Sequence, residues 1–339
     1  MCDLIHRRRY VVAKDNSNLN QWANLPSPLR YYGSKWGLAD WIIGSMPKVD
    51  QYDGYGEYFG GSGAILLRKM PSKVEVYNDM DSVVVNFYRV VRDTVLRDQL
   101  MAAITLTPFA RAECDAAIKP DVGRDGPVEA ARKFYVCSWQ GRGMGAATSR
   151  EKSGWRFVRD SFSAYPPSDF YDRAESLLWV AERLQHVQIE CGDAMECMDR
   201  YDSPNFLHYL DPPYAHNTSS IGGSGRSTSR SAKAVYQGEM NDSQHEALLL
   251  KVTTGGLKGM IVISGYDSDL YRRYFGTPEA PKGGWSIVSR EAVTDRGQKK
   301  MEFLWLNEYA TRAVNRADIR STLAVPSVAG VSAEQSVMF

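Results

Sequence analysis

The residues best suited to chemistry form an Asp-Pro-Pro-Tyr run directly after an apolar stretch: Asp211, Pro212, Pro213 and Tyr214 after residues 206–210. Proline cannot continue a sheet ladder, so a strand should end here in a stiff backbone. The Asp211 carboxylate and the Pro212 carbonyl could accept the two N–H bonds of an exocyclic amine such as adenine N6. They would favour a pyramidal nitrogen and stabilise its developing positive charge. Tyr214 could stack on a base extruded from a duplex, and the alternative is a strand-ending turn with a buried tyrosine.

A second candidate site is the glycine-rich segment 59–63, which contains Gly60, Gly61 and Gly63. Glycine lets a backbone turn sharply and approach a ligand closely, and the N-terminus of a following helix offers free N–H donors. The spacing differs from the Gly-x-Gly-x-x-Gly fingerprint of dinucleotide-binding proteins. The segment alone is therefore compatible with a dinucleotide, a nucleoside or a plain turn.

Two acidic residues favour one of these ligands over the others. Asp79 falls at the carboxyl end of the predicted strand 73–77, where a carboxylate can accept both hydroxyls of a ribose. Asp193 is expected to end a third strand, 187–190, and could accept a hydrogen bond from an adenine amine. Each aspartate could instead cap a helix. The glycine segment and Asp79 together favour a nucleoside ligand whose ribose 2′ and 3′ positions are free.

The predicted secondary structure would position these residues on parallel strands. Short β-branched runs alternate with helical patterns, which predicts an α/β fold with a mostly parallel sheet and helices on both faces. The final two strands should form a hairpin around the turn-prone residues 295–297. Asp81 or Ser82 should cap one helix. The predicted strands are 52–59, 73–77, 187–190, 206–210, 260–264, 285–293 and 301–306, and the helices between the first strands are 64–70 and 82–95.

One region interrupts the alternation. Residues 96–186 are mainly helical or irregular and are expected to form an inserted domain, which splits the catalytic domain into residues 26–95 and 187–310. Residues 217–231 are rich in Ser, Gly and Thr, so a mobile loop is expected after the Asp-Pro-Pro-Tyr run. The two ends, residues 1–25 and 311–339, have the composition of weakly ordered segments.

The net charge, the cysteines and the apolar runs of the sequence limit the kinds of site and partner that are expected. The formal net charge is +1, so only local basic clusters could contact nucleic acid, and ordinary solvated surface is their alternative reading. Five scattered cysteines form no Cys-x-x-Cys pair, so neither a metal site nor a disulfide framework is expected. No apolar run is long enough to span a bilayer. The candidate DNA contacts are Arg142, Arg226, Arg230, Lys233, Lys299 and Lys300.

The chain resembles Dam-like DNA adenine methyltransferases, including those of phages and prophages, over about residues 29–307. Two blocks depart from the family pattern: Tyr58 stands where Pro is frequent, and residues 31–35 replace a frequent Trp-Ala-Gly-Gly-Lys. The inserted segment also lacks the Arg-Tyr-Asn signature of GATC-specific members, so GATC specificity is not implied. The blocks that carry the resemblance occur in the family's order: residues 30–35 (Arg-Tyr-Tyr-Gly-Ser-Lys), 57–63 (Glu-Tyr-Phe-Gly-Gly-Ser-Gly), 77–81 (Tyr-Asn-Asp-Met-Asp), 211–214, 236–245, 263–267 and 299–304.

The resemblance implies a Rossmann-like sheet that binds S-adenosylmethionine, with the inserted domain recognising the DNA target. It implies direct methyl transfer to adenine N6 in double-stranded DNA after base flipping, with Asp211 to Tyr214 as the catalytic residues and no metal. The residues implied for the cofactor are Tyr31, Tyr32, Gly33, Lys35, Glu57, Phe59, Gly60, Gly61, Gly63, Asp79, Asp193 and Asp211.

The expected partner is double-stranded DNA rather than a membrane, and the expected form is a monomer or weak dimer in a bacterial or phage-infected cytoplasm. A paired restriction nuclease is compatible with this setting. Three alternatives stay open at this point. The chain could methylate RNA or a protein amide, it could be a catalytically silent DNA-binding protein on a methyltransferase scaffold, or it could be a nicotinamide dehydrogenase.

Overall fold

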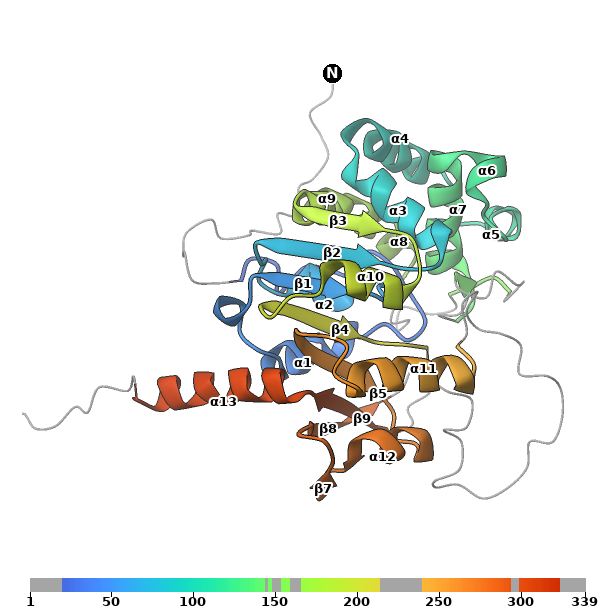
Figure 1. Cartoon of the computed structure of the whole chain (residues 1–339). Coiled ribbons are helices and arrows are strands. Elements are labelled where there is room, and N and C mark those ends of the chain that lie inside the picture. Colours follow the sequence, from blue (N-terminus) through green and yellow to red (C-terminus); the bar gives the residue numbers. More distant parts are fainter. Residues whose placement is uncertain are drawn as a thin grey trace, which may run out of the picture.

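The structure is a computed structural model that describes residues 20–143, 146–147, 154–158, 166–213, 240–293 and 299–323. Its described part is built on a seven-stranded sheet with helices on both faces (Figure 1). The strand order is β3-β2-β1-β4-β5-β9-β8. The strands are β1 (Gly54–Glu57), β2 (Val74–Asn78), β3 (Val187–Glu190), β4 (Phe206–Leu210), β5 (Met260–Gly265), β8 (Ser286–Val293) and β9 (Lys299–Leu306).

The first five strands are parallel, and β9 joins them antiparallel to β5 and pairs with β8 as a terminal hairpin. This confirms the predicted mostly parallel, Rossmann-like sheet. The register pairs Glu57 of β1 with Tyr77 of β2 and with Tyr209 of β4. The loops that follow these three strands therefore leave the sheet at one edge, which is where ligands bind in open α/β sheets.

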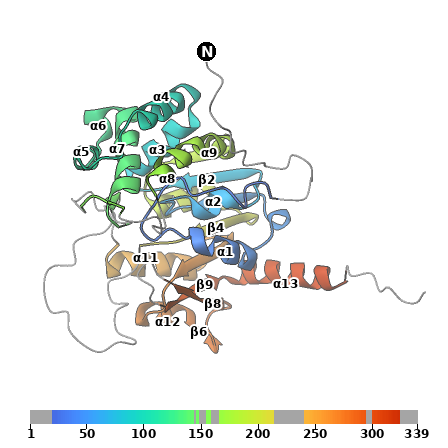
Figure 2. The same cartoon turned by 180° about the vertical axis from the view of Figure 1, so that it is seen from behind.

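Strand residues alternate between two apolar cores. Tyr77 and Tyr209 pack into one core, while their neighbours Val76 and Leu210 pack into the other. Figure 1 shows the helices of the second core in front of the sheet, and Figure 2 shows helices of the first from behind. The first core includes α1 (Ala39–Ser45), α2 (Ala64–Arg68), α3 (Ser82–Arg92), α9 (Leu177–Leu184) and α13 (Glu308–Leu323), and the second includes α10 (Ala194–Tyr201), α11 (Asp242–Thr253) and α12 (Asp269–Phe275).

The long interval between β2 and β3 is helical in its described part, as expected. Its longest helix, α7, packs on α3 through the stacked rings of Phe87 and Tyr135, whose centroids are 6.4 Å apart. Ser138 of α7 also accepts the Arg30 N–H at 2.7 Å, so this helix holds the start of the 30–35 block. Division into an inserted domain at 96–186 stays a prediction. The helices are α4 (Thr94–Thr105), α5 (Arg111–Ala116), α6 (Val122–Asp125), α7 (Pro127–Gln140) and α8 (Pro167–Glu175).

Several boundaries differ from the expected ones. The helix α13 extends into the segment expected to be weakly ordered from residue 311. At the other end of the chain, Trp22 and Leu25 are buried, although they lie within the expected N-terminal weakly ordered segment. The cap of α3 is Asp81, whose side chain accepts the Val83 N–H, as one of the two predicted candidates. The remaining short elements are η1 (Trp36–Leu38), η2 (Val49–Gln51), β6 (Gly276–Thr277) and β7 (Ala280–Pro281).

Candidate active site

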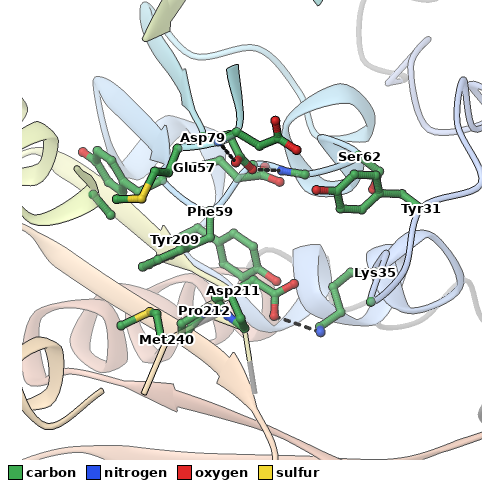
Figure 3. A pocket seen from close by; sticks show the side chains of 18 of the residues that line it. Tyr31, Lys35, Glu57, Phe59, Ser62, Asp79, Tyr209, Asp211, Pro212 and Met240 are labelled. Carbon is green, nitrogen blue, oxygen red and sulfur yellow. Dashed lines mark hydrogen bonds and ion pairs between the residues drawn. The ribbon is translucent and has the colours of Figure 1, made fainter. Parts of the chain in front are cut away.

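A cavity of about 250 Å³ opens at the carboxyl edge of the parallel strands. Loops after β1, β2, β3 and β4 line it, together with residues 31–35 and the start of α11. In Figure 3, Asp79 lies on one side of Phe59 and Asp211 on the other. The tertiary structure therefore brings the glycine segment, the Asp79 strand end and the Asp-Pro-Pro-Tyr run to one cavity, although more than a hundred residues separate the last two.

The glycine segment touches the rings of two buried tyrosines. A Cβ on Gly60 would lie 2.3 Å from the Tyr77 ring, and one on Gly61 would lie 2.8 Å from the Tyr31 ring. Gly61 and Gly63 also have positive φ values of 46° and 63°, which side chains with a Cβ rarely adopt. Glycine is thus required here by close approach as well as by backbone conformation.

Asp79 holds this segment in place. Its Oδ2 accepts the Gly61 N–H at 2.8 Å, and its Oδ1 accepts the Asp81 N–H at 2.8 Å. Burial raises the pKa of the Asp79 carboxyl to about 6 despite these hydrogen bonds. A carboxylate oxygen has more than one acceptor position, so Asp79 can still accept hydroxyl groups from a ligand in the cavity.

Glu57 lines the same cavity but makes its described hydrogen bonds away from it. Its Oε2 accepts the Leu66 N–H of α2 at 2.7 Å and the Tyr55 hydroxyl at 3.0 Å. Burial raises the pKa of the Glu57 carboxyl to about 8. These contacts stabilise the turn from β1 into α2, and a direct cofactor contact by Glu57 stays a prediction.

Asp193 does not end a strand, because β3 stops at Glu190. The residue instead caps α10, where its side chain accepts the Met195 and Glu196 N–H groups. The intervening turn is held by Asn78, whose side-chain amide exchanges two hydrogen bonds with the backbone of Gly192. The helix-capping alternative is thus realised; Asp193 also lines the cavity, and its contact with an adenine amine stays a prediction.

The N-terminal block lies against the glycine segment. Tyr31 is buried, Tyr32 is exposed, and Gly33 has a φ of 71°. The Ser34 hydroxyl lies 2.8 Å from the Ser62 hydroxyl, which links the block to the loop after β1. Tyr31, Tyr32, Gly33 and Lys35 line the cavity with Phe59, Gly60 and Gly61, whereas Gly63 begins α2 behind them.

Asp211 is held by two side chains that both contact its Oδ1. The Lys35 ammonium lies 2.8 Å from this oxygen, and the Ser264 hydroxyl donates to it at 2.8 Å. Ser264 is in turn 2.9 Å from the Tyr209 hydroxyl. Pro212 and Pro213 line the cavity next to Asp211, and Tyr214 lies outside the described residues.

Comparison with known families agrees with this geometry. Residues 31–117 match the family model of the D12 class N6 adenine-specific DNA methyltransferases. This family is the predicted one. The match contains the N-terminal block, the glycine segment and Asp79, and it ends before residue 211. No curated protein matches the chain.

The match to this family supports DNA adenine methylation as the general activity of the chain. Such enzymes generally take their methyl group from S-adenosylmethionine. Among the residues that the structure describes, no cluster of His, Cys, Asp or Glu could hold a metal ion. Nor does any described helix have the length and apolar character needed to cross a membrane.

Sequence reasoning gave no role to several residues of the site. Ser264 and Glu302 lie in blocks that resemble the family, but nothing in the sequence connects them with Asp211 or Lys35. The apolar wall was given no role either, although Met80 and Met240 lie in such blocks, because methionine fills irregular space without a fixed pattern. That wall includes Met80, Met195, Met240 and Leu248.

The described candidate DNA contacts lie on exposed surface. Gly265 of β5 pairs with Phe303 of β9, so Lys299 and Lys300 extend beyond the carboxyl end of β5, at the edge where the cavity opens. Lys299 pairs with Glu291 at 2.8 Å, and the Lys300 ammonium lies 4.8 Å from the centre of the Tyr266 ring. Arg142 is exposed after α7, while Arg226, Arg230 and Lys233 lie outside the described residues.

Proposed function

We propose that the chain is a site-specific DNA methyltransferase that transfers the methyl group of S-adenosylmethionine to adenine N6 in double-stranded DNA. One observation carries the proposal. Asp211, followed by Pro212, lies in the same cavity as the glycine segment and Asp79. The residues proposed to bind a nucleoside and those proposed to bind an amine therefore line one cavity.

The residues of the cavity fit S-adenosylmethionine. Asp79 offers acceptors for the two ribose hydroxyls, and Met80 and Met195 offer apolar contact for an adenine ring beside Asp193. The absence of a Cβ at Gly60 and Gly61 keeps the loop pressed onto Tyr77 and Tyr31, which leaves room beside it. When bound, this cofactor supplies a methyl group activated by its attachment to a sulfonium.

Asp211 would act on the amine through its second carboxylate oxygen, Oδ2. Lys35 and Ser264 contact Oδ1, and neither of these described contacts uses Oδ2. Oδ2 and the Pro212 carbonyl can then accept the two N–H bonds of adenine N6. Both acceptors stabilise positive charge as it develops on that nitrogen, and the fixed carboxylate needs little reorganisation.

Access of adenine to Asp211 requires the base to leave the duplex. We propose that Tyr214 stacks on the extruded base, and that the segment 96–186 reads the sequence of the DNA. Arg142, Lys299 and Lys300 are the described side chains proposed to contact DNA, with Arg226, Arg230 and Lys233 as further candidates.

The test is transfer of tritium from labelled S-adenosylmethionine to unmethylated duplex DNA, followed by nucleoside analysis. Label in 6-methyladenine supports the proposal, and the Asp211→Ala variant gives the background. Label found only in RNA, protein or N4-methylcytosine refutes it. An absence of transfer together with an absence of cofactor binding in calorimetry would instead support a silent DNA-binding protein.

A further inference from the structure

Lys35 lies between two carboxylates, of which the proposed function uses only one. Its ammonium is 2.8 Å from Asp211 Oδ1 and 3.2 Å from Glu302 Oε1. Lys35 is 4% exposed and Glu302 is 1% exposed. Lys35 and Glu302 are thus removed from water beside the partly exposed Asp211, and burial at this level is costly unless the charges are paired.

The terminal hairpin places Glu302. In β9 the buried Glu302 and Leu304 point to the same face, since strand residues two apart share a face. Leu304 is paired with Ser264 of β5, the residue that donates to Asp211. One antiparallel strand therefore brings a carboxylate to Lys35 beside the strand that orients Asp211.

The charge of Glu302 changes the electrostatic potential at Asp211. Asp211 and Lys35 alone form a neutral pair, which attracts a developing cation weakly. Among these three described side chains, Glu302 adds a second formal negative charge against the one positive charge of Lys35. Glu302 also attracts the Lys35 ammonium, at 3.2 Å, so the Asp211 carboxylate is less fully neutralised and keeps more of its negative potential.

A second buried ion cluster of this protein has more cations than carboxylates. Glu75 is paired with both Lys69 and Arg183, so two cations surround one carboxylate beneath α9. None of these three residues lines the cavity. The ratio of two carboxylates to one ammonium at Lys35 therefore differs from that of this second described cluster.

We infer that Glu302 is a positioning residue for methyl transfer, acting through Lys35 to keep Asp211 fixed and net negative toward the amine. The inference rests on the proposed function. Glu302 is not among the residues that line the cavity, so its loss should lower the rate of the chemical step and leave ligand binding nearly unchanged.

The experiment compares the wild type, Glu302→Gln, Lys35→Met and the double variant. Glu302→Gln is nearly isosteric and removes only the charge. We expect it to lower kcat roughly tenfold to a hundredfold, with the KM values for DNA and cofactor changed less than about threefold. In the Lys35→Met background the same substitution should lower kcat less than about threefold, because the partner through which Glu302 acts is gone.

Glu308→Gln is the matched control, because it removes the same charge directly after β9, where Glu308 pairs with exposed Arg312. Its kcat should equal that of the wild type. A second readout is the affinity for S-adenosylhomocysteine in calorimetry, which Glu302→Gln should leave within about threefold. If Glu302→Gln does not fold, Glu302→Asp replaces it, with an expected fall in kcat of several-fold.

Two results would overturn the inference. One is an unchanged kcat in folded Glu302→Gln, which would leave the residue a purely structural role. The other is an equal loss of kcat with and without Lys35. A wild-type protein that methylates no adenine would overturn the proposed function as well, whereas an active wild type with an unaffected variant overturns only the inference.

Discussion

At the scale of single residues, the proposed chemistry depends on which oxygen of Asp211 is available. Lys35 and Ser264 both contact Oδ1, and Tyr209 extends this network through Ser264. The three partners come from a loop near the N-terminus, from β5 and from β4. Lys35 and Ser264 fix the carboxylate directly and Tyr209 acts through Ser264, and none of these described contacts is to Oδ2.

Removal of the Asp211 carboxylate should abolish most turnover. We expect Asp211→Ala to lower kcat by about three orders of magnitude or more, while DNA affinity changes by less than about threefold. Single-turnover methylation and a DNA titration would measure the two quantities. Asp211→Asn keeps the shape of the side chain and controls for the loss of a partner for buried Lys35. The exposed Asp50→Ala should behave as the wild type, and full activity in both Asp211 variants would contradict the mechanism.

The raised pKa of Asp79 predicts that ligand binding depends on pH. Its carboxyl has a pKa raised to about 6, and ribose hydroxyls donate best to the ionised form. Protons bound by Asp79 at low pH must leave before the ligand binds well. Affinity for S-adenosylhomocysteine should therefore fall up to about tenfold per pH unit below pH 6 and level off above it.

Calorimetric titrations between about pH 5 and pH 8 would measure this slope. The control is Asp79→Asn, which has no group to titrate and should bind more weakly with little dependence on pH. An identical slope in both proteins would show that another group titrates.

At the scale of elements, the turn from β1 into α2 determines the shape of the cavity. The turn is held from two sides, by Asp79 at Gly61 and by Glu57 at the Leu66 N–H. Tyr77 also donates from its hydroxyl to the Gly61 carbonyl at 2.7 Å. The loop is thus rigid before any ligand arrives, which lowers the entropy lost on binding.

Gly60→Ala should disrupt this turn, since the new Cβ would lie 2.3 Å from the Tyr77 ring. We expect a loss of about 1–3 kcal/mol in the free energy of unfolding, as for other overpacked sites, and a cofactor affinity at least about tenfold weaker. Chemical denaturation and calorimetry would measure both.

Gly44→Ala in α1 is the matched control for that substitution. Apart from its chain neighbours and the backbone of its own helix, nothing lies within 4 Å of the position that a Cβ would take there. Alanine also favours a helix more than glycine does. The stability of this variant should be equal to or greater than that of the wild type. Equal behaviour of the two variants would mean that the glycine turn is not sterically restricted.

At the scale of the whole molecule, the carboxyl edge of the sheet gathers the functional surface. The cavity opens there, and the start of β9 extends past the same edge with Lys299 and Lys300. The opposite edge carries Lys73, just before β2, in an ion pair with Asp53 at 2.6 Å. Two exposed lysines in similar ion pairs thus lie at opposite ends of the parallel strands.

This arrangement gives a matched pair of substitutions. Lys299→Ala should weaken DNA binding and lower the slope of log affinity against log salt by about one, as expected for one lost phosphate contact. Lys73→Ala should leave both unchanged. Fluorescence anisotropy at several salt concentrations would measure the slopes, and an unchanged slope for Lys299→Ala would exclude that contact.

The sequence by itself determined the parallel strands, the terminal hairpin and about half of the residues that line the cavity. Local rules suffice for these features, because apolar periodicity defines strands and Pro212 must end one. The family blocks supplied further expectations at residues 30–35 and 57–63. Since parallel strands have their carboxyl ends at one edge, Asp79 and Asp211 could be expected near each other without knowledge of the contacts between them.

The tertiary structure alone decided how these residues are held. Ser264 and Asp211 are 53 positions apart, and the contact of Lys35 with Glu302 spans most of the chain. Asp193 caps a helix and does not end a strand, because β3 stops at Glu190 and the chain then turns at Gly192, whose N–H donates to the Asn78 side chain. Such contacts depend on strand order and register, which join distant segments and have no local pattern in the sequence.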